Sequence, residues 1–176
     1  ESGCCEGKGG SASIQSKSIP MFGHSGFMGD NIPLGVGYSI ATDKPVLIIA
    51  GDAASEEDYS LTSLGYACTK RAKVLFICED NDLSILTPTE VRRTWSVTNV
   101  MSAMGIDSHS VKPGDPLFND LLKNCSNMQK PQFINVQVQR AIWHAGSGFD
   151  GLKEADLLSE NLKIISATCQ DIFSNY

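Results

Sequence analysis

Oxygen-bearing side chains stand after two apolar runs of this sequence. Asp52 follows the run from Val46 to Ala50, and Asn81 comes three residues after the run from Val74 to Cys78. Both runs are short and rich in Val, Leu and Ile, which is typical of buried parallel strands. Because ligands bind outside the carboxyl ends of the strands in open parallel sheets, the two side chains are candidates for one shared site.

Their chemistry suits a magnesium ion that carries phosphate. Mg²⁺ is usually bound by one or two carboxylates together with phosphate and water oxygens, and Asp52 and Asn81 offer a carboxylate and an amide oxygen. The turn from Asp52 to Ser55 also opens a predicted helix, whose free N–H groups favour phosphate. The alternative is an ordinary strand-to-helix turn, with Ser55 as N-cap and Glu56 and Glu57 complementing the helix dipole.

The spacing of these residues resembles the thiamine-diphosphate signature, G-D-G followed by N-N about two dozen residues later. Here 26 residues, positions 54 to 79, separate Ala53 from Asp80. In enzymes with this signature the aspartate, the second asparagine and a main-chain carbonyl two residues later hold Mg²⁺ against the cofactor diphosphate. The resemblance therefore assigns the metal to Asp52, Asn81 and the carbonyl of Leu83. The cofactor-binding residues implied around the motif are Gly51, Asp52, Ala53, Ala54, Asn81 and Leu83.

Three further segments resemble the alpha subunits of the decarboxylating component of 2-oxo-acid dehydrogenase complexes, the family of pyruvate, branched-chain 2-oxo-acid and acetoin dehydrogenases. Residues 3–11 are similar to its G-C-x-x-G-K-G-G-S run, and residues 76–81 to its F-I-C-E-N-N. Residues 26–35 are similar to its G-x-V-G-x-x-x-P-L-G, whose backbone contacts the aminopyrimidine ring of the cofactor. By that match, Gly26 and Met28 would offer main-chain groups to the ring.

Two histidines are candidates for catalysis. His24 lies on the loop that the resemblance places beside the cofactor, and His144 follows a predicted strand end, so each could meet a developing oxyanion. Residues 143–147 are similar to the family's Y-H-G-H-S, with His144 at the first histidine and Gly146 in place of the second. His109 lies within a predicted strand, and we expect a structural role for it.

The chain departs from the family pattern in places, which leaves two alternatives open. Ala53 replaces the third glycine of the motif, Asp80 replaces the first asparagine, and Ser13 stands where the family has a histidine. Residues 80–85 are also similar to the D-N-x-x-S-I of transketolase and deoxyxylulose-phosphate synthase. The alternatives are therefore a transketolase-like split subunit that transfers ketol groups, and a degenerate scaffold that keeps only the fold.

The resemblance implies a thiamine-diphosphate-dependent 2-oxo-acid dehydrogenase in which this chain is the alpha-type subunit. A beta-type subunit would supply the pyrimidine domain and its activating glutamate, since no glutamate of this sequence stands in a matching motif. A heterotetramer, with a lipoyl acyltransferase as acceptor, is the implied assembly. Family alpha subunits are longer, so we expect a fragment, a processed form or half of a split enzyme.

Composition argues against several other classes of protein. The 176 residues, with 41% hydrophobic content, 19% charged content and a net charge of −6, indicate a soluble acidic domain that folds without disulfides. The absence of a Lys/Arg tract argues against nucleic acid, and no apolar stretch reaches the length of a membrane span. The first ten residues lack signal-peptide character, so we expect a cytoplasmic location, or the mitochondrial matrix in a eukaryote. The six cysteines are interpreted as free thiols.

Alternating strands and helices predict an α/β fold, a doubly wound and mostly parallel sheet flanked by helices. The expected helices are 31–42, 56–69, 96–104 and 116–124, and the expected strands are 46–50, 74–78, 106–111 and 133–138. Residues 1–20 are rich in Gly and Ser and are expected to form a leading loop, 21–150 the thiamine-diphosphate and Mg²⁺ domain, and 151–176 a helical tail.

Some side-chain roles follow from these elements. Asn31 is expected to cap the first helix, while Gly35 and Gly37 would let a neighbouring element approach closely. Arg92 and Arg93 could bind a substrate carboxylate or the diphosphate, with a solvated surface position as the alternative. The expected inward stripe of the second helix is Tyr59, Leu61, Leu64, Ala67 and Cys68.

Overall fold

A computed structural model describes residues 20–23 and 25–139 of the chain. Its central sheet has four parallel strands in the order β1-β2-β6-β5. These are β1 (Val46–Gly51), β2 (Val74–Asp80), β6 (Gln132–Gln137) and β5 (Asp107–Val111). The predicted parallel sheet is therefore confirmed, whereas residues 1–19, His24 and the predicted helical tail lie outside the described residues.

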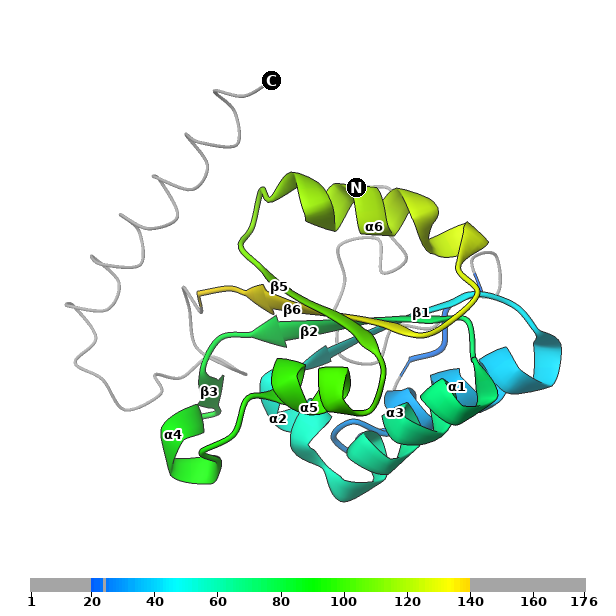
Figure 1. The fold of residues 1–176 in the computed structure, drawn as a ribbon. Coiled ribbons are helices and arrows are strands. Elements are labelled where there is room, and N and C mark those ends of the chain that lie inside the picture. The colour runs from blue at the N-terminus through cyan, green and yellow to red at the C-terminus, as the bar shows by residue number, and fades with distance from the viewer. Residues whose placement is uncertain (1–19, 24, 140–176) are drawn as a thin grey trace, which may run out of the picture.

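Helices cover both faces of the sheet, as the predicted doubly wound architecture requires. Figure 1 shows one layer of helices below the sheet and α6 (Pro116–Asn124) above it. The lower layer consists of α1 (Asn31–Thr42), α2 (Asp52–Glu56), α3 (Asp58–Lys70) and α5 (Val97–Ala103). Within the described residues, no helix is long and apolar enough to cross a membrane.

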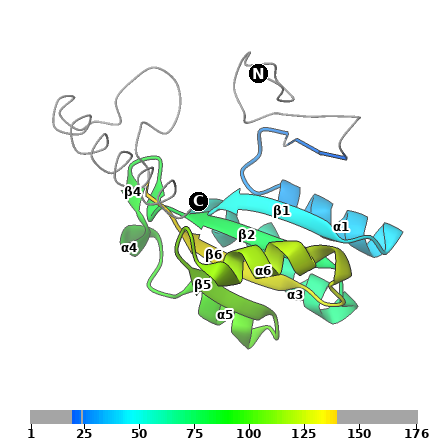
Figure 2. The ribbon, with the colours of Figure 1, turned by 90° about the horizontal axis from the view of Figure 1, so that it is seen from above.

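Three small elements lie beyond the carboxyl end of β2. They are the paired strands β3 (Leu83–Ser84) and β4 (Thr87–Pro88), and the short helix α4 (Thr89–Arg92). Both ribbon views place them at the edge of the sheet toward which the strands point (Figures 1 and 2). No element is predicted for this segment, because two-residue strands and a four-residue helix leave no periodic pattern in the sequence.

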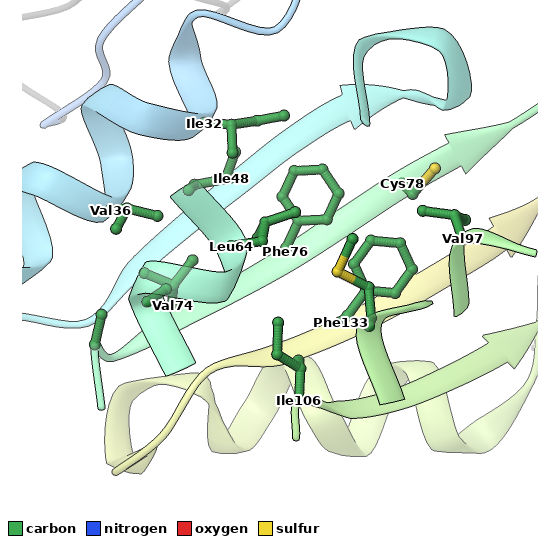
Figure 3. Packing of buried hydrophobic residues seen from close by; sticks show 13 residues of the cluster. Ile32, Val36, Ile48, Leu64, Val74, Phe76, Cys78, Val97, Ile106 and Phe133 are labelled. Carbon is green, nitrogen blue, oxygen red and sulfur yellow. The ribbon is translucent and has the colours of Figure 1, made fainter. Parts of the chain in front are cut away.

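Side chains of the central strands alternate between two apolar cores. Val74, Phe76 and Cys78 of β2 face the layer of α1, α3 and α5, where Phe76 stacks on Phe133 with ring centroids 5.1 Å apart (Figure 3). Leu75 and Ile77 face α6 instead. A strand buried on both faces reads as a continuous apolar run, which explains why the sequence located β2 so clearly.

The predicted helix over residues 56–69 is in fact two helices. Its backbone is broken at Glu57, which has φ −58° and ψ 141°, between α2 and α3. α3 begins at Asp58, and its fully buried residues are Ser60, Leu64 and Ala67. Tyr59, expected to point inward, is 38% exposed, so this part of the predicted stripe was wrong.

The first helix has the predicted bounds but not the predicted cap. Asn31 is its first residue, and the side-chain Nδ2 of Asn31 donates to the carbonyl of Ile49 at 2.8 Å, which ties α1 to β1. A Cβ at Gly35 would lie 2.5 Å from Cδ1 of Ile48, so the close approach expected there is confirmed. The same expectation was wrong for Gly37, where no described heavy atom outside the local helix backbone lies within 4 Å of such a Cβ.

Candidate active site

The carboxyl ends of β1 and β2 lie side by side. Gly51 pairs with Glu79 in the parallel register, Asp52 follows at the start of α2, and Asp80 is the last residue of β2. Asn81 comes directly after Asp80. The two residues on which the predicted site depends therefore stand at the same edge of the sheet, one beyond each strand.

Asp52 is the buried centre of this edge. It is only 3% exposed, and its Oδ2 accepts a hydrogen bond from Thr89 Oγ1 at 3.1 Å and another from the Arg92 guanidinium. Burial raises the pKa of the Asp52 carboxyl, the Arg92 charge and the Thr89 hydrogen bond oppose that rise, and the nearby Asp80 carboxylate adds to it. Because burial disfavours the ionised form, the Asp52 carboxylate depends on a nearby positive charge to remain ionised.

Two arginines from the end of α4 carry positive charge into this region. Arg92 Nη1 lies 3.0 Å from Glu56 Oε1, and Arg93 Nε donates to the same oxygen at 2.7 Å. Their side chains are only 15% and 8% exposed, so the solvated alternative was wrong. Glu56 ends α2 and pairs with both guanidinium groups, so its expected role at a helix start was also wrong. The Arg93 guanidinium also lies 5.2 Å from the ring centroid of Trp95.

The turn after β2 is built by its own polar side chains. Asp80 Oδ1 accepts from the Asp82 N–H at 3.1 Å, and Asn81 Oδ1 accepts from the Leu83 N–H at 3.0 Å. On the other side, Asn135 Nδ2 of β6 donates to Asp80 Oδ2 at 2.9 Å. Asn135 is not among the predicted site residues, although a polar residue in the middle of the apolar run of β6 is a signal for such a role.

A hollow of about 580 Å³ opens between the ends of β2 and β6. One wall is formed by residues 80–83 and the other by residues 137–139. Asp52 is not among these lining residues, so the hollow lies on the Asn81 side of the edge.

The segment before α1 packs against the same edge. The Tyr59 hydroxyl donates to the carbonyl of Met28, one of the main-chain groups that the resemblance assigns to the cofactor ring. Gly29 has φ +83°, and a Cβ there would lie 2.7 Å from the carbonyl oxygen of Ala54. The segment from Gly26 to Gly29 is therefore close to the start of α2 and α3.

The predicted site residues are thus partly brought together. Gly51, Asp52, Ala53 and Ala54 form one continuous strand-to-helix turn, and Asn81 and Leu83 form the neighbouring turn. His24 and His144 lie outside the described residues. His109 pairs with Asp107 at 3.0 Å on β5, in line with a structural role.

The donors at this edge fit a hard cation better than a soft one. Among the described residues, no group of three or more His, Cys, Asp and Glu could hold a metal. Asp52, the Asn81 amide and main-chain carbonyls supply only oxygen, which is the chemistry of Mg²⁺ when phosphate and water complete the shell. An ion here would therefore depend on its ligand for part of its coordination.

An open parallel sheet with oxygen donors and a helix start at its carboxyl edge defines an α/β domain of the ligand-binding type. The family model described as dehydrogenase E1 component matches residues 2–145. The chain belongs to the dehydrogenase E1 component family.

Curated relatives agree with that membership. The chain is 32% identical over 93 residues to the mitochondrial pyruvate dehydrogenase E1 component subunit alpha of Sminthopsis macroura, covering 50% of this chain and 25% of that protein. It is 31% identical over 93 residues to the somatic human form, covering 50% and 23%. It is 34% identical over 86 residues to the Dictyostelium discoideum protein, covering 46% and 22%. The chain spans about a quarter of the length of the relatives it matches.

Among solved structures, the chain is similar to a transketolase from Campylobacter jejuni. The TM-score is 0.48 at 18% identity, with 62% of this chain and 18% of that chain covered.

Proposed function

We propose that this chain is an alpha-type component that binds thiamine diphosphate through Mg²⁺ and takes part in the decarboxylation of a 2-oxo acid. Family membership supports the class of enzyme. The observation that supports cofactor binding is the pairing of Gly51 with Glu79, which brings Asp52 and Asn81 to neighbouring strand ends.

Roles for individual residues follow from this proposal. Asp52, the Asn81 side chain and the carbonyl of Leu83 hold the metal, while Gly51, Ala53 and Ala54 border the diphosphate at the start of α2. Gly26 and Met28 border the ring, with the Met28 carbonyl already accepting from Tyr59. His24 and His144 are the proposed acid-base groups. When bound, the cofactor supplies the electron sink that the loss of carbon dioxide requires.

The proposal includes partners. A beta-type subunit would supply the pyrimidine domain and the activating glutamate, and a lipoyl acyltransferase would accept the product. The curated relatives, which are named as alpha subunits, support the expectation of a partner subunit.

Calorimetric titration of the full chain with thiamine diphosphate, with and without Mg²⁺, tests the binding step. Binding heat that depends on Mg²⁺ is expected. If neither the chain alone nor the chain with its beta-type partner gives such heat, the proposal is contradicted. Turnover of 2-oxo acids by the paired subunits with an artificial electron acceptor tests the reaction. Turnover of sugar phosphates in their place would support the transketolase-like alternative.

A second candidate function is a scaffold subunit that no longer binds the cofactor. The observation that favours it is the contact between Arg92 and Asp52, because a guanidinium already neutralises the carboxylate proposed to bind the metal. The same titration separates the candidates, since a scaffold gives no heat that depends on Mg²⁺.

A further inference from the structure

The Asp52 carboxylate is bound by groups of its own chain on several sides. Thr89 and Arg92 both donate hydrogen bonds to its Oδ2, from a hydroxyl and a guanidinium. Each oxygen of an ionised carboxylate offers about two acceptor positions, so those of Oδ2 are taken. A metal ion that binds Asp52 through Oδ2 must therefore displace one of these donors.

Arg92 is the donor that a cation displaces most readily. Its positive charge repels an arriving Mg²⁺, whereas the Thr89 hydroxyl is neutral. Its guanidinium also uses its donors poorly, since Nε and Nη1 are buried and lack a hydrogen-bond partner among the described residues. Leaving Asp52 would let those nitrogens find better partners.

Glu56 is placed to receive the displaced guanidinium. Its Oε1 lies 3.0 Å from Arg92 Nη1, a distance that makes an ion pair but not a well-directed hydrogen bond in this arrangement. A small rotation of Arg92 toward Glu56 would convert this contact into a directed charge-assisted bond. Both acids lie in α2, one helical turn apart, so the exchange needs no movement of the helix.

We propose that Arg92 is the resident counter-cation of Asp52, that Mg²⁺ carrying the cofactor diphosphate displaces it, and that Glu56 accepts it. Arg92 thereby lowers the affinity for the metal, since a metal ion that binds through Oδ2 must break the contact between Arg92 and Asp52. This inference rests on the proposed function, and it adds a residue that competes with the metal for its ligand.

The test measures the unfolding midpoint of the full chain in EDTA, and calorimetric binding of MgCl₂ with saturating thiamine diphosphate. Arg92→Gln should lower the metal-free midpoint by roughly 5 °C, because it leaves a buried carboxylate without its counter-charge. The same variant should bind Mg²⁺ about tenfold more tightly, because the competing charge is gone. Glu56→Gln should change the affinity in the opposite direction, since the receiving carboxylate is lost.

Arg71→Gln is the matched control. Arg71 is exposed at the end of α3, so the variant makes the same change of net charge and should leave both measurements unchanged. If Arg92→Gln does not fold, Arg92→Lys replaces it as the test variant. Lysine keeps the positive charge but lacks the planar guanidinium, so this variant should bind Mg²⁺ more tightly than the natural chain.

The outcomes separate the two proposals. If the natural chain binds Mg²⁺ and the cofactor but neither Arg92 variant binds Mg²⁺ more tightly, this inference is overturned. The proposed function is then unaffected. No binding by the natural chain or by any variant overturns both. Binding by Arg92→Gln but not by the natural chain supports the inference and contradicts binding by the natural chain on its own.

Discussion

Asn135 donates a hydrogen bond to Asp80 from the neighbouring strand, with Nδ2 and Oδ2 separated by 2.9 Å. The other oxygen of Asp80 accepts from the backbone of Asp82. Asp80 therefore links β6 to the turn that presents Asn81. The family signature has an asparagine at this position, and the carboxylate found here is matched by an amide donor from the adjacent strand.

Asn135→Asp should destabilise the chain by about 3 kcal/mol, because it replaces the buried hydrogen bond to Asp80 with two facing carboxylates. Urea denaturation followed by circular dichroism measures this change. Asn99→Asp makes the same substitution on the exposed first turn of α5, where a change within about 0.5 kcal/mol is expected. Equal effects of the two variants would contradict the role assigned to Asn135.

Asp52→Asn should weaken Mg²⁺-dependent binding of thiamine diphosphate by roughly a hundredfold, because the amide carries no charge to attract the ion. Its oxygen can still accept from Thr89 and Arg92, so the fold should be retained. Asp120→Asn is the control, since Asp120 is exposed on α6 and lies outside the proposed site. Similar affinities in the two variants, measured by calorimetry, would remove Asp52 from the proposed metal site.

Gly29→Ala should destabilise the chain by roughly 2–3 kcal/mol, because the added methyl would collide with the Ala54 carbonyl at a positive φ. Gly37→Ala adds the same methyl inside α1, where no described atom outside the local helix backbone lies within 4 Å, and should stabilise by about 0.5–1 kcal/mol. Thermal unfolding of both variants gives the comparison. A neutral Gly29→Ala would mean that the segment before α1 does not pack on α2 as described.

Cys78 should resist alkylation in the folded chain at neutral pH. Burial raises the pKa of its thiol from 9.0 to about 12, partly opposed by the contact with Ser55 Oγ at 3.3 Å. Since the folded value is the higher one, this contribution to stability is complete below pH 9 and is lost as the pH rises toward 12. Peptide mapping after iodoacetamide treatment tests reactivity. The free energy of unfolding of Cys78→Ala should therefore fall less between pH 9 and pH 12 than that of the natural chain.

Much of the fold follows from local sequence signals. The Val- and Ile-rich runs located β1 and β2. The helix predicted over residues 116–124 is confirmed as α6, where the Asp115 side chain accepts from the Leu117 N–H as an N-cap. The break at Glu57 left no such signal, because neither glycine nor proline marks it. α2 packs against β1, β2 and β3, and such tertiary contacts leave no local pattern in the sequence.

The candidate site was predictable only where a residue is next to a strand end. Asp52 and Asn81 met that condition. The partners that determine their environment come from distant parts of the sequence, with Arg92 40 residues from Asp52 and Asn135 55 residues from Asp80. Such contacts depend on the order of strands in the sheet, which neither motif nor periodicity specifies.

On the sheet face that α6 covers, the side chains of β1 are left exposed, which has a practical consequence for work with this chain. Leu47 and Ile49 are 46% and 49% exposed, although their register partners Leu75 and Ile77 are buried beneath α6. Adjacent apolar side chains on a sheet surface promote association between molecules. Preparations of the isolated polypeptide should therefore scatter more light as concentration rises, and Leu47→Lys should improve its solubility.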